Sequence, residues 1–207
     1  ISYEDRVDTM PIDFTTNPEE VLVVWTPVIP RDSVLLNFFK AHYTLKKRSE
    51  VLGMITKDFY TIAVAGTHGK TSTSSLVAHL LKSAGKPVAA FLGGITQNYQ
   101  SNLILPGKTK EQVLVVVEAD EFDRSFLRLY PNEAVVTSTD PDHLDIYGDE
   151  AAILEGFRDF IRLVDKRGKL YIQSHALFRL GEMLDAKARQ QEYGLRSTGI
   201  HAENVIA

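Results

Sequence analysis

Short apolar runs and stretches with helical spacing alternate along most of this chain. The apolar runs have the length of β-strands and cover residues 60–65, 88–91, 113–118, 134–138 and 169–173. The helical stretches cover residues 70–83, 149–164 and 176–190. Strands that alternate with helices predict an α/β fold with a doubly wound, mostly parallel sheet. The strand cores at 114–117 and 134–136 are continuously apolar, which is typical of strands covered on both faces.

The first fifty residues form a separate pattern. Residues 21–25 predict a buried strand and residues 33–41 an amphipathic helix, and Pro27 and Pro30 interrupt the chain between them. Residues 44–58 are mixed in character and predict a linker with a short helix. We therefore expect two parts, one over residues 1–50 and a larger one over 51–207.

The segment 92–112 predicts a long loop, because it is rich in Gly, Asn and Gln. Long loops in compact domains are usually functional or mobile. Gly93 and Gly94 within it would permit a close backbone approach to a ligand, or simply form a turn.

Composition excludes several classes of function. The chain has 207 residues, 44% of them hydrophobic, and a formal net charge of -4, so a core of good size is expected and an electrostatically recruited nucleic acid is not. It contains no cysteine, which excludes disulfides and thiolate chemistry. No signal-like start or membrane-length apolar stretch is present, so the expected location is the cytoplasm. Because the chain starts without Met, we expect the protein to extend beyond it.

The most informative motif joins the strand at 60–65 to the helix that begins near Lys70. Its sequence, Gly66-Thr67-His68-Gly69-Lys70-Thr71, is that of a phosphate-binding loop, although Val64 stands where the full pattern has its first glycine. The glycines let backbone N–H groups turn toward an anion at the positive end of the helix dipole. Lys70 adds a full positive charge, and Thr71 adds a hydroxyl suited to Mg²⁺. The alternative is an ordinary strand-to-helix turn.

Two further polar motifs follow strands. Residues 118–123 (EADEFD) come after one apolar strand, and residues 140–145 (DPDHLD) come after the next. In an open parallel sheet the carboxyl ends of the strands share one crevice where ligands bind. All three motifs are therefore expected to meet around one ligand.

The carboxylates of the first motif predict a cation. Glu118 ends an apolar strand, where an unpaired carboxylate would be costly, so it predicts a metal ligand or else a cap of the next turn. Asp120, Glu121 and Asp123 follow within one turn, and a divalent cation would relieve their repulsion, although some of them could instead be solvated or paired with Arg124.

The second motif contains His143, between two aspartates. A neutral imidazole there could join a metal's ligand shell or bind water, and neighbouring carboxylates would orient its ring. A lone loop histidine is otherwise structural or merely exposed.

With GTHGKT, EADEFDRSFL and TDPDHLDIYG in this order, the chain resembles the Mur ligase superfamily, and within it the branch that adds L-alanine to UDP-N-acetylmuramate. The resemblance implies that residues 1–50 end a UDP-substrate domain and that 51–207 are most of the central ATP-binding domain. The C-terminal domain would lie outside this sequence, so the fragment alone is not expected to turn over.

The family's activity is ATP-driven amide bond formation in peptidoglycan precursor synthesis, through an acyl phosphate. By resemblance, the loop residues Gly66 to Thr71, with the Ser72 that follows, would bind ATP. Lys70, Glu118 and His143 would be catalytic, with Thr71, Glu118 and His143 near Mg²⁺. Candidate contacts to the sugar nucleotide are Thr26, Pro27, Gly93, Gly94, Asp120 and Glu121.

Three other functions remain open on the sequence. The first is a recycling ligase that attaches a ready-made murein peptide to the same sugar nucleotide. The second is a P-loop kinase or NTPase, which predicts a separate strand ending in a metal-binding Asp. The third is a nucleotide-binding module without activity. The sequence makes no prediction about oligomeric state.

Overall fold

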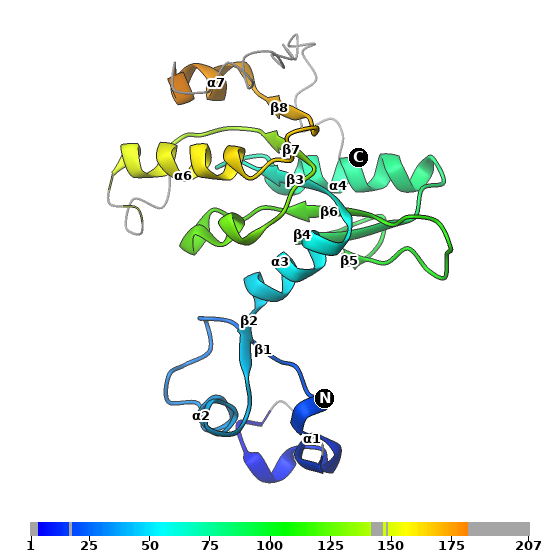
Figure 1. Ribbon diagram of the computed structural model, residues 1–207, viewed down its shortest axis with the longest axis vertical. Helices are drawn as coiled ribbons and strands as arrows, with labels where there is room; N and C mark the ends of the chain where they lie inside the picture. The colour runs from blue at the N-terminus through cyan, green and yellow to red at the C-terminus, as the bar shows by residue number, and fades with distance from the viewer. Residues whose placement is uncertain (1–3, 17, 142–146, 148, 182–207) are drawn as a thin grey trace. The chain divides into compact units, whose positions relative to one another are not determined.

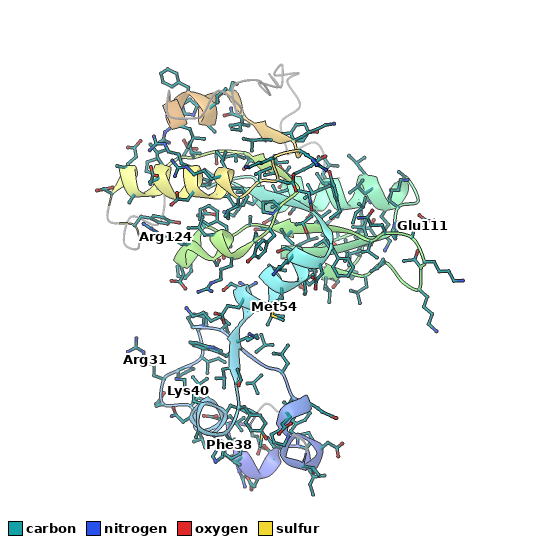
Figure 2. The ribbon with its side chains drawn as sticks, in the orientation of Figure 1. Arg31, Phe38, Lys40, Met54, Glu111 and Arg124 are labelled. Carbon is teal, nitrogen blue, oxygen red and sulfur yellow. The ribbon has the colours of Figure 1, made fainter. Side chains whose placement is uncertain are left out.

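The computed structural model of the chain describes residues 4–16, 18–141, 147 and 149–181. The chain divides into two compact units, Ile1–Met54 and Ile55–Ala207. The division falls inside one helix, at Met54, which Figure 2 labels. It lies four residues beyond the boundary expected from the sequence.

The first unit contains short elements. They are η1 (Val7–Thr9), α1 (Ile12–Thr16), η2 (Pro18–Glu20), β1 (Val23–Trp25), α2 (Val34–His42), β2 (Leu45–Lys47) and the start of α3 (Arg48–Asp58). The second unit holds the remaining elements. They are β3 (Tyr60–Ala65), α4 (Lys70–Ser83), β4 (Val88–Thr96), β5 (Ser101–Ile104), β6 (Leu114–Glu118), η3 (Phe122–Arg128), β7 (Glu133–Val136), α6 (Glu150–Arg162), β8 (Leu170–Ile172) and α7 (Ser174–Leu180).

The second unit is built on a six-stranded sheet in the order β5-β4-β6-β3-β7-β8 (Figure 1). All neighbouring strands are parallel except β5, which runs antiparallel to β4. The predicted α/β class with a mostly parallel sheet is confirmed. β3 lies between β6 and β7, so the loop that follows β3 starts at the centre of the sheet.

Central strands are buried because their sequences are apolar on both faces. Residues 63–65 of β3 and 116–117 of β6 have no exposed surface. α4 packs over β4 and β6, where Ala78 joins a core cluster that includes Val88 and Val116. This burial holds the strand ends, and the residues that follow them, at fixed positions.

α6 is anchored by aromatic packing on η3. The ring of Phe126 in η3 lies 5.2 Å from that of Phe160 and 5.6 Å from that of Phe157, both on α6. All three side chains are at most 1% exposed. The turn after β6 is therefore held from the helix side as well as from the sheet.

The prediction of a long loop over 92–112 is wrong in its first half. β4 continues through the two glycines to Thr96, and β5 pairs with it, Ala90 opposite Ile104. The hairpin is closed at its tip, where the Thr96 hydroxyl donates to the carbonyl of Ser101 at 2.9 Å. Because this is an edge hairpin with exposed apolar residues such as Ile95 and Leu103, its sequence lacks the continuous apolar run of a central strand.

The other predicted elements occur with shifted ends. The helix expected from residue 176 begins two residues earlier, as α7, and its predicted continuation past 181 lies outside the described residues. No helix in the described part of the chain is both long enough and apolar enough to cross a bilayer.

In the first unit, β1 and β2 form a parallel pair, with Val23 opposite Leu45. The sequence predicts a linker over β2, because three residues are too few to show a strand pattern. α2 begins where the carboxylate of Asp5 accepts hydrogen bonds from the backbone N–H groups of Leu35 and Val34, each at 2.8 Å. These bonds lower the pKa of Asp5. Figure 2 labels Phe38 and Lys40 on this helix.

Candidate active site

The loop between β3 and α4 takes a conformation that needs glycine. Gly66 and Gly69 have φ of 136° and 80°. A Cβ atom on Gly66 would lie 2.1 Å from the hydroxyl oxygen of Thr137, which follows β7. The loop is thus pressed against the end of the neighbouring strand, and no larger residue fits at Gly66.

Hydrogen bonds tie this loop to the residues after β7. The N–H of Thr67 donates to the carbonyl of Ser138 at 3.2 Å, and its hydroxyl donates to the carbonyl of Asp140 at 2.8 Å. The N–H of His68 donates to the hydroxyl of Ser138 at 2.8 Å, and the Thr137 hydroxyl donates to the carbonyl of His68 at 2.5 Å. The residues that directly follow β7 therefore shape the loop, and of the motif at 140–145 the Asp140 carbonyl takes part.

The helix that follows begins at Lys70, directly after the left-handed Gly69. The N–H groups of a first helical turn have no partner inside the helix, and the helix dipole adds positive charge there. This helix end lies at the carboxyl edge of the sheet, where an open α/β sheet binds ligands. The backbone arrangement is that of an anion site.

The ammonium group of Lys70 has three oxygen acceptors. Its Nζ lies 2.7 Å from the carbonyl oxygen of Gly66, 3.3 Å from that of Thr67 and 2.8 Å from Oε1 of Glu121. The Lys70 side chain is 14% exposed. The positive charge thus lies at the mouth of the loop, mostly enclosed but still in contact with solvent.

Glu118 ends β6 and lies beside the start of α4. Its Oε1 accepts from the Thr71 hydroxyl at 3.0 Å, and its Oε2 accepts from the N–H of Gly93 at 2.7 Å. A Cβ atom on Gly93 would lie 2.3 Å from the Glu118 carboxylate, and one on Gly94 would lie 3.2 Å from the methyl group of Thr71. The structure brings these four residues together, and both glycines leave room for the Thr71 and Glu118 side chains.

Glu121 has a partner that the sequence did not predict. Its side chain is 3% exposed and pairs with Lys70, whereas the sequence predicts a metal, solvent, Arg124 or the sugar nucleotide as its partner. The Arg124 guanidinium lies instead 5.4 Å from the centre of the Tyr147 ring; Figure 2 labels this residue. The Tyr147 hydroxyl donates to the Glu121 carbonyl at 2.6 Å. Tyr147 was missed because nothing in its local sequence marks this contact.

The pKa of Tyr147 is raised to about 12. Burial of the phenol is the main cause, and the negative charge of Glu121 adds to it. Tyr147 therefore stays protonated, and remains a hydrogen-bond donor, throughout the neutral pH range.

The described residues offer oxygen ligands for Mg²⁺ but no complete cage. The Thr71 hydroxyl and the Glu118 carboxylate lie together, and no group of three or more Asp, Glu, His or Cys side chains is placed to hold a metal in the parts of the chain described. Mg²⁺ in nucleotide sites commonly takes one or two protein oxygens and completes its shell with phosphates and waters. The pair fits that pattern. His143, the third predicted ligand, lies outside the described residues.

The remaining predicted residues are Ser72, Asp120, Thr26 and Pro27. Ser72 is exposed on the first turn of α4, and Asp120 accepts from the N–H of Phe122 at 3.1 Å within the turn after β6. Thr26 and Pro27 belong to the first unit, where the Thr26 carbonyl closes a turn.

Comparison with protein families places most of the chain in one of them. Residues 64–207 match the Mur ligase middle domain. A protein from Flavobacterium psychrophilum called UDP-N-acetylmuramate--L-alanine ligase is 54% identical over 173 residues, covering 83% of this chain and 37% of that protein. A protein of the same name from Cytophaga hutchinsonii is 43% identical over 211 residues, covering 97% of this chain and 45% of that protein. The chain thus spans less than half of these relatives.

Two solved structures with similar folds carry different names. UDP-N-acetylmuramate-alanine ligase MurC from Thermotoga maritima superposes with a TM-score of 0.64 at 26% identity, over 77% of this chain and 36% of that one. A UDP-N-acetylmuramate:L-alanyl-gamma-D-glutamyl-meso-diaminopimelate ligase from Neisseria meningitides gives the same TM-score and identity, over 77% and 54%. Structural likeness alone does not separate the two.

Proposed function

The chain belongs to the Mur ligase family, and from this we propose that it forms the ATP-binding part of an enzyme that joins L-alanine to UDP-N-acetylmuramate. One observation carries the proposal at the site. Lys70 and Thr71 open a helix at the carboxyl edge of the sheet, and the Glu118 carboxylate lies 3.0 Å from the Thr71 hydroxyl. That arrangement supplies a phosphate cradle, a positive charge and metal-binding oxygens within one loop and its neighbouring strand end.

The reaction that suits this site is phosphoryl transfer followed by amide formation. A carboxylate oxygen of the muramyl group attacks the γ-phosphorus of ATP, and the bond to the ADP oxygen breaks. The amine of L-alanine then attacks the acyl carbon, loses a proton and expels phosphate. Phosphoryl transfer depends mainly on positioning and charge neutralisation, which Lys70 and the helix terminus supply.

We propose that the site also binds Mg²⁺. We assign the Thr71 hydroxyl and the Glu118 carboxylate as its protein ligands, with His143 near a second position. Once bound, the metal neutralises charge on the phosphate oxygens. The N–H of Gly93 and the Thr71 hydroxyl orient the Glu118 carboxylate beforehand, and metal sites commonly depend on such hydrogen bonds.

The relatives' greater length supports a domain assignment. We propose that residues 1–50 end the domain that binds UDP-N-acetylmuramate and that 51–207 belong to the central ATP-binding domain. A C-terminal domain that receives the amino acid would then lie outside this sequence. Thr26 and Pro27 are candidate contacts to the sugar nucleotide, as are Gly93, Gly94 and Asp120. Glu121, the sixth candidate, is buried against Lys70. We expect the enzyme to act in the cytoplasm on small molecules, without nucleic acid or membrane.

The second candidate function is a ligase that differs in the acceptor, which is a murein peptide instead of L-alanine. A murein-peptide ligase shares the fold equally well, since both solved structures give the same TM-score. The sequence relatives favour L-alanine, because proteins 54% and 43% identical carry that name.

The test uses the full-length protein that contains this chain. Amide product is measured with ATP, Mg²⁺ and UDP-N-acetylmuramate. The acceptor is either L-alanine or the tripeptide L-alanyl-gamma-D-glutamyl-meso-diaminopimelate, which the ligase from Neisseria meningitides has in its name. We expect product with L-alanine. Product only with the tripeptide would identify the recycling ligase, and ADP formation without any amide would favour an NTPase.

Lys70→Ala should abolish ligation, because the positive charge at the transferred phosphoryl group is lost. Lys82→Ala is the matched control, since Lys82 is on the same helix but lies over the Tyr99 ring, 4.8 Å from its centre. Near-normal ligation by Lys70→Ala would contradict the assigned mechanism.

A further inference from the structure

The Lys70 ammonium has no spare proton for a phosphate in this structure. An ammonium group has three N–H donors, and three protein oxygens accept from it: the carbonyls of Gly66 and Thr67 and the Glu121 carboxylate. If Lys70 contacts ATP, one of these bonds must be exchanged for a bond to phosphate. Which bond is given up decides where the Lys70 ammonium lies when ATP is bound.

The three bonds are unequal. The bond to the Thr67 carbonyl is the longest, at 3.3 Å, against 2.7 Å to Gly66 and 2.8 Å to Glu121. A bond to an ionised partner is stronger than one to a neutral carbonyl. The Thr67 bond is therefore the easiest to exchange.

The Glu121 bond is the costliest to break. The Glu121 side chain is 3% exposed, and its Oε2 atom has no hydrogen-bond partner among the described residues. Removing Lys70 would leave a buried carboxylate without its cation, which is strongly unfavourable. Exchange at Glu121 is thus opposed by the burial of that side chain.

Glu121 is itself held firmly. Its carbonyl accepts from the Tyr147 hydroxyl at 2.6 Å and from the N–H of Arg124 at 2.9 Å. Two residues earlier, the N–H of Ala119 donates to the carbonyl of Val64 in β3 at 2.8 Å. The turn that carries Glu121 is therefore fixed to the same strand that carries the phosphate loop.

From these contacts we propose that Glu121 is a positioning residue for Lys70. It stays paired with the ammonium when ATP binds, while the Thr67 bond is exchanged for a phosphate oxygen. The two carboxylates then have different roles: Glu118 lies beside Thr71 as a proposed Mg²⁺ ligand, and Glu121 positions Lys70. The inference rests on the proposed function.

The test is Glu121→Gln in the full-length protein. Gln has nearly the same shape and keeps an oxygen that accepts from Lys70, but it lacks the charge that fixes the ammonium. Displacement of a catalytic group by about 1 Å can cost roughly 100-fold in rate, so we expect kcat to fall by about 10- to 100-fold. KM for ATP, and Kd for MgATP measured by calorimetry, should change by less than about 3-fold, because the loss is larger in the transition state than in the ground state.

The matched control is Asp123→Asn. It removes a negative charge from an exposed residue in the same turn, and Asn tolerates the positive φ of 53° at this position. Its kcat should stay near that of the unmodified protein. An equal fall in both variants would attribute the effect to the general charge of the turn and overturn the proposal.

An unchanged kcat in Glu121→Gln would also overturn it. If KM for ATP is unchanged as well, Glu121 has no role in catalysis; if KM is lower, Glu121 restrains Lys70 from ATP. If Glu121→Gln does not fold, Glu121→Asp tests the proposal instead, because it keeps the charge but moves the carboxylate away from Lys70. We then expect kcat to fall several-fold, and an unchanged kcat would contradict the proposal. Should the unmodified protein fail to ligate, the proposed function fails instead.

Discussion

Glu118 and Glu121 lie three residues apart in one acidic turn, yet they hold different partners. Glu118 accepts from Thr71 and Gly93, and Glu121 pairs with Lys70. The sequence predicts a partner for Glu118, because a carboxylate at the end of an apolar strand would otherwise be costly. It does not predict the partner of Glu121, because an ion pair between residues 51 positions apart depends on how the strands are ordered in the sheet.

Replacing Glu118 with Gln should raise the Mg²⁺ concentration needed for half-maximal ligation, by roughly 10-fold or more, because a charged ligand is lost. The measurement is a Mg²⁺ titration of ligation by the full-length protein at saturating ATP. Glu111→Gln is the control, since Glu111 is an exposed residue, labelled in Figure 2. An unchanged Mg²⁺ requirement would remove Glu118 from the ligands.

Tyr147 should make stability depend on alkaline pH. The folded protein raises its pKa to about 12, whereas an unfolded chain has a tyrosine pKa of about 10. The folded state thus holds the phenolic proton more tightly, so this contribution is complete below pH 10 and is lost as the pH rises toward 12.

Tyr147→Phe should therefore show a smaller loss of stability between pH 10 and 12 than the unmodified chain, measured by urea unfolding at several pH values. Part of the loss should remain, because the pKa of Tyr60 is also raised to about 12 by burial and by its hydrogen bond to Glu133. The same pH dependence in both proteins would contradict the assignment.

Among the elements, the phosphate loop with its flanking strand and helix was the easiest to predict. β3 and α4 have the predicted bounds, since an apolar strand, a glycine turn and an amphipathic helix each leave a strong local signal. The sequence predicts the first half of β4, at 88–91, but not its continuation or its pairing with β5. Gly93 and Gly94 interrupt the apolar pattern there, and the far end of the hairpin is exposed, as at Ile95. The Glu118 contact supplies the reason for glycine there.

The first turn of α6 is capped by a side chain. The Asp149 side chain accepts from the N–H of Ala152 at 2.8 Å, which is an N-cap. Asp149→Ala should lower the free energy of unfolding by about 1 kcal/mol, the usual cost of losing such a cap. Asp159→Ala on the same helix loses only an exposed ion pair with Arg162 and should cost less than about 0.5 kcal/mol. Equal losses would argue against the cap.

For the whole molecule, the chain is two compact units and spans less than half of the relatives that it matches. The α/β class followed from the alternation of strands and helices, and family membership from three motifs that follow three strands. The short first unit was harder to read, since β2 has only three residues. The proposed activity would belong to the full-length protein, so the central claim is best tested there.

The most direct measurement follows oxygen from the muramyl carboxylate to phosphate. UDP-N-acetylmuramate labelled with ¹⁸O in both carboxylate oxygens is ligated to L-alanine by the full-length protein, and the released phosphate is analysed by mass spectrometry. An acyl-phosphate route at Lys70 predicts one ¹⁸O atom in each phosphate for each amide formed, and no labelled phosphate from Lys70→Ala. Amide formation with unlabelled phosphate would contradict the account.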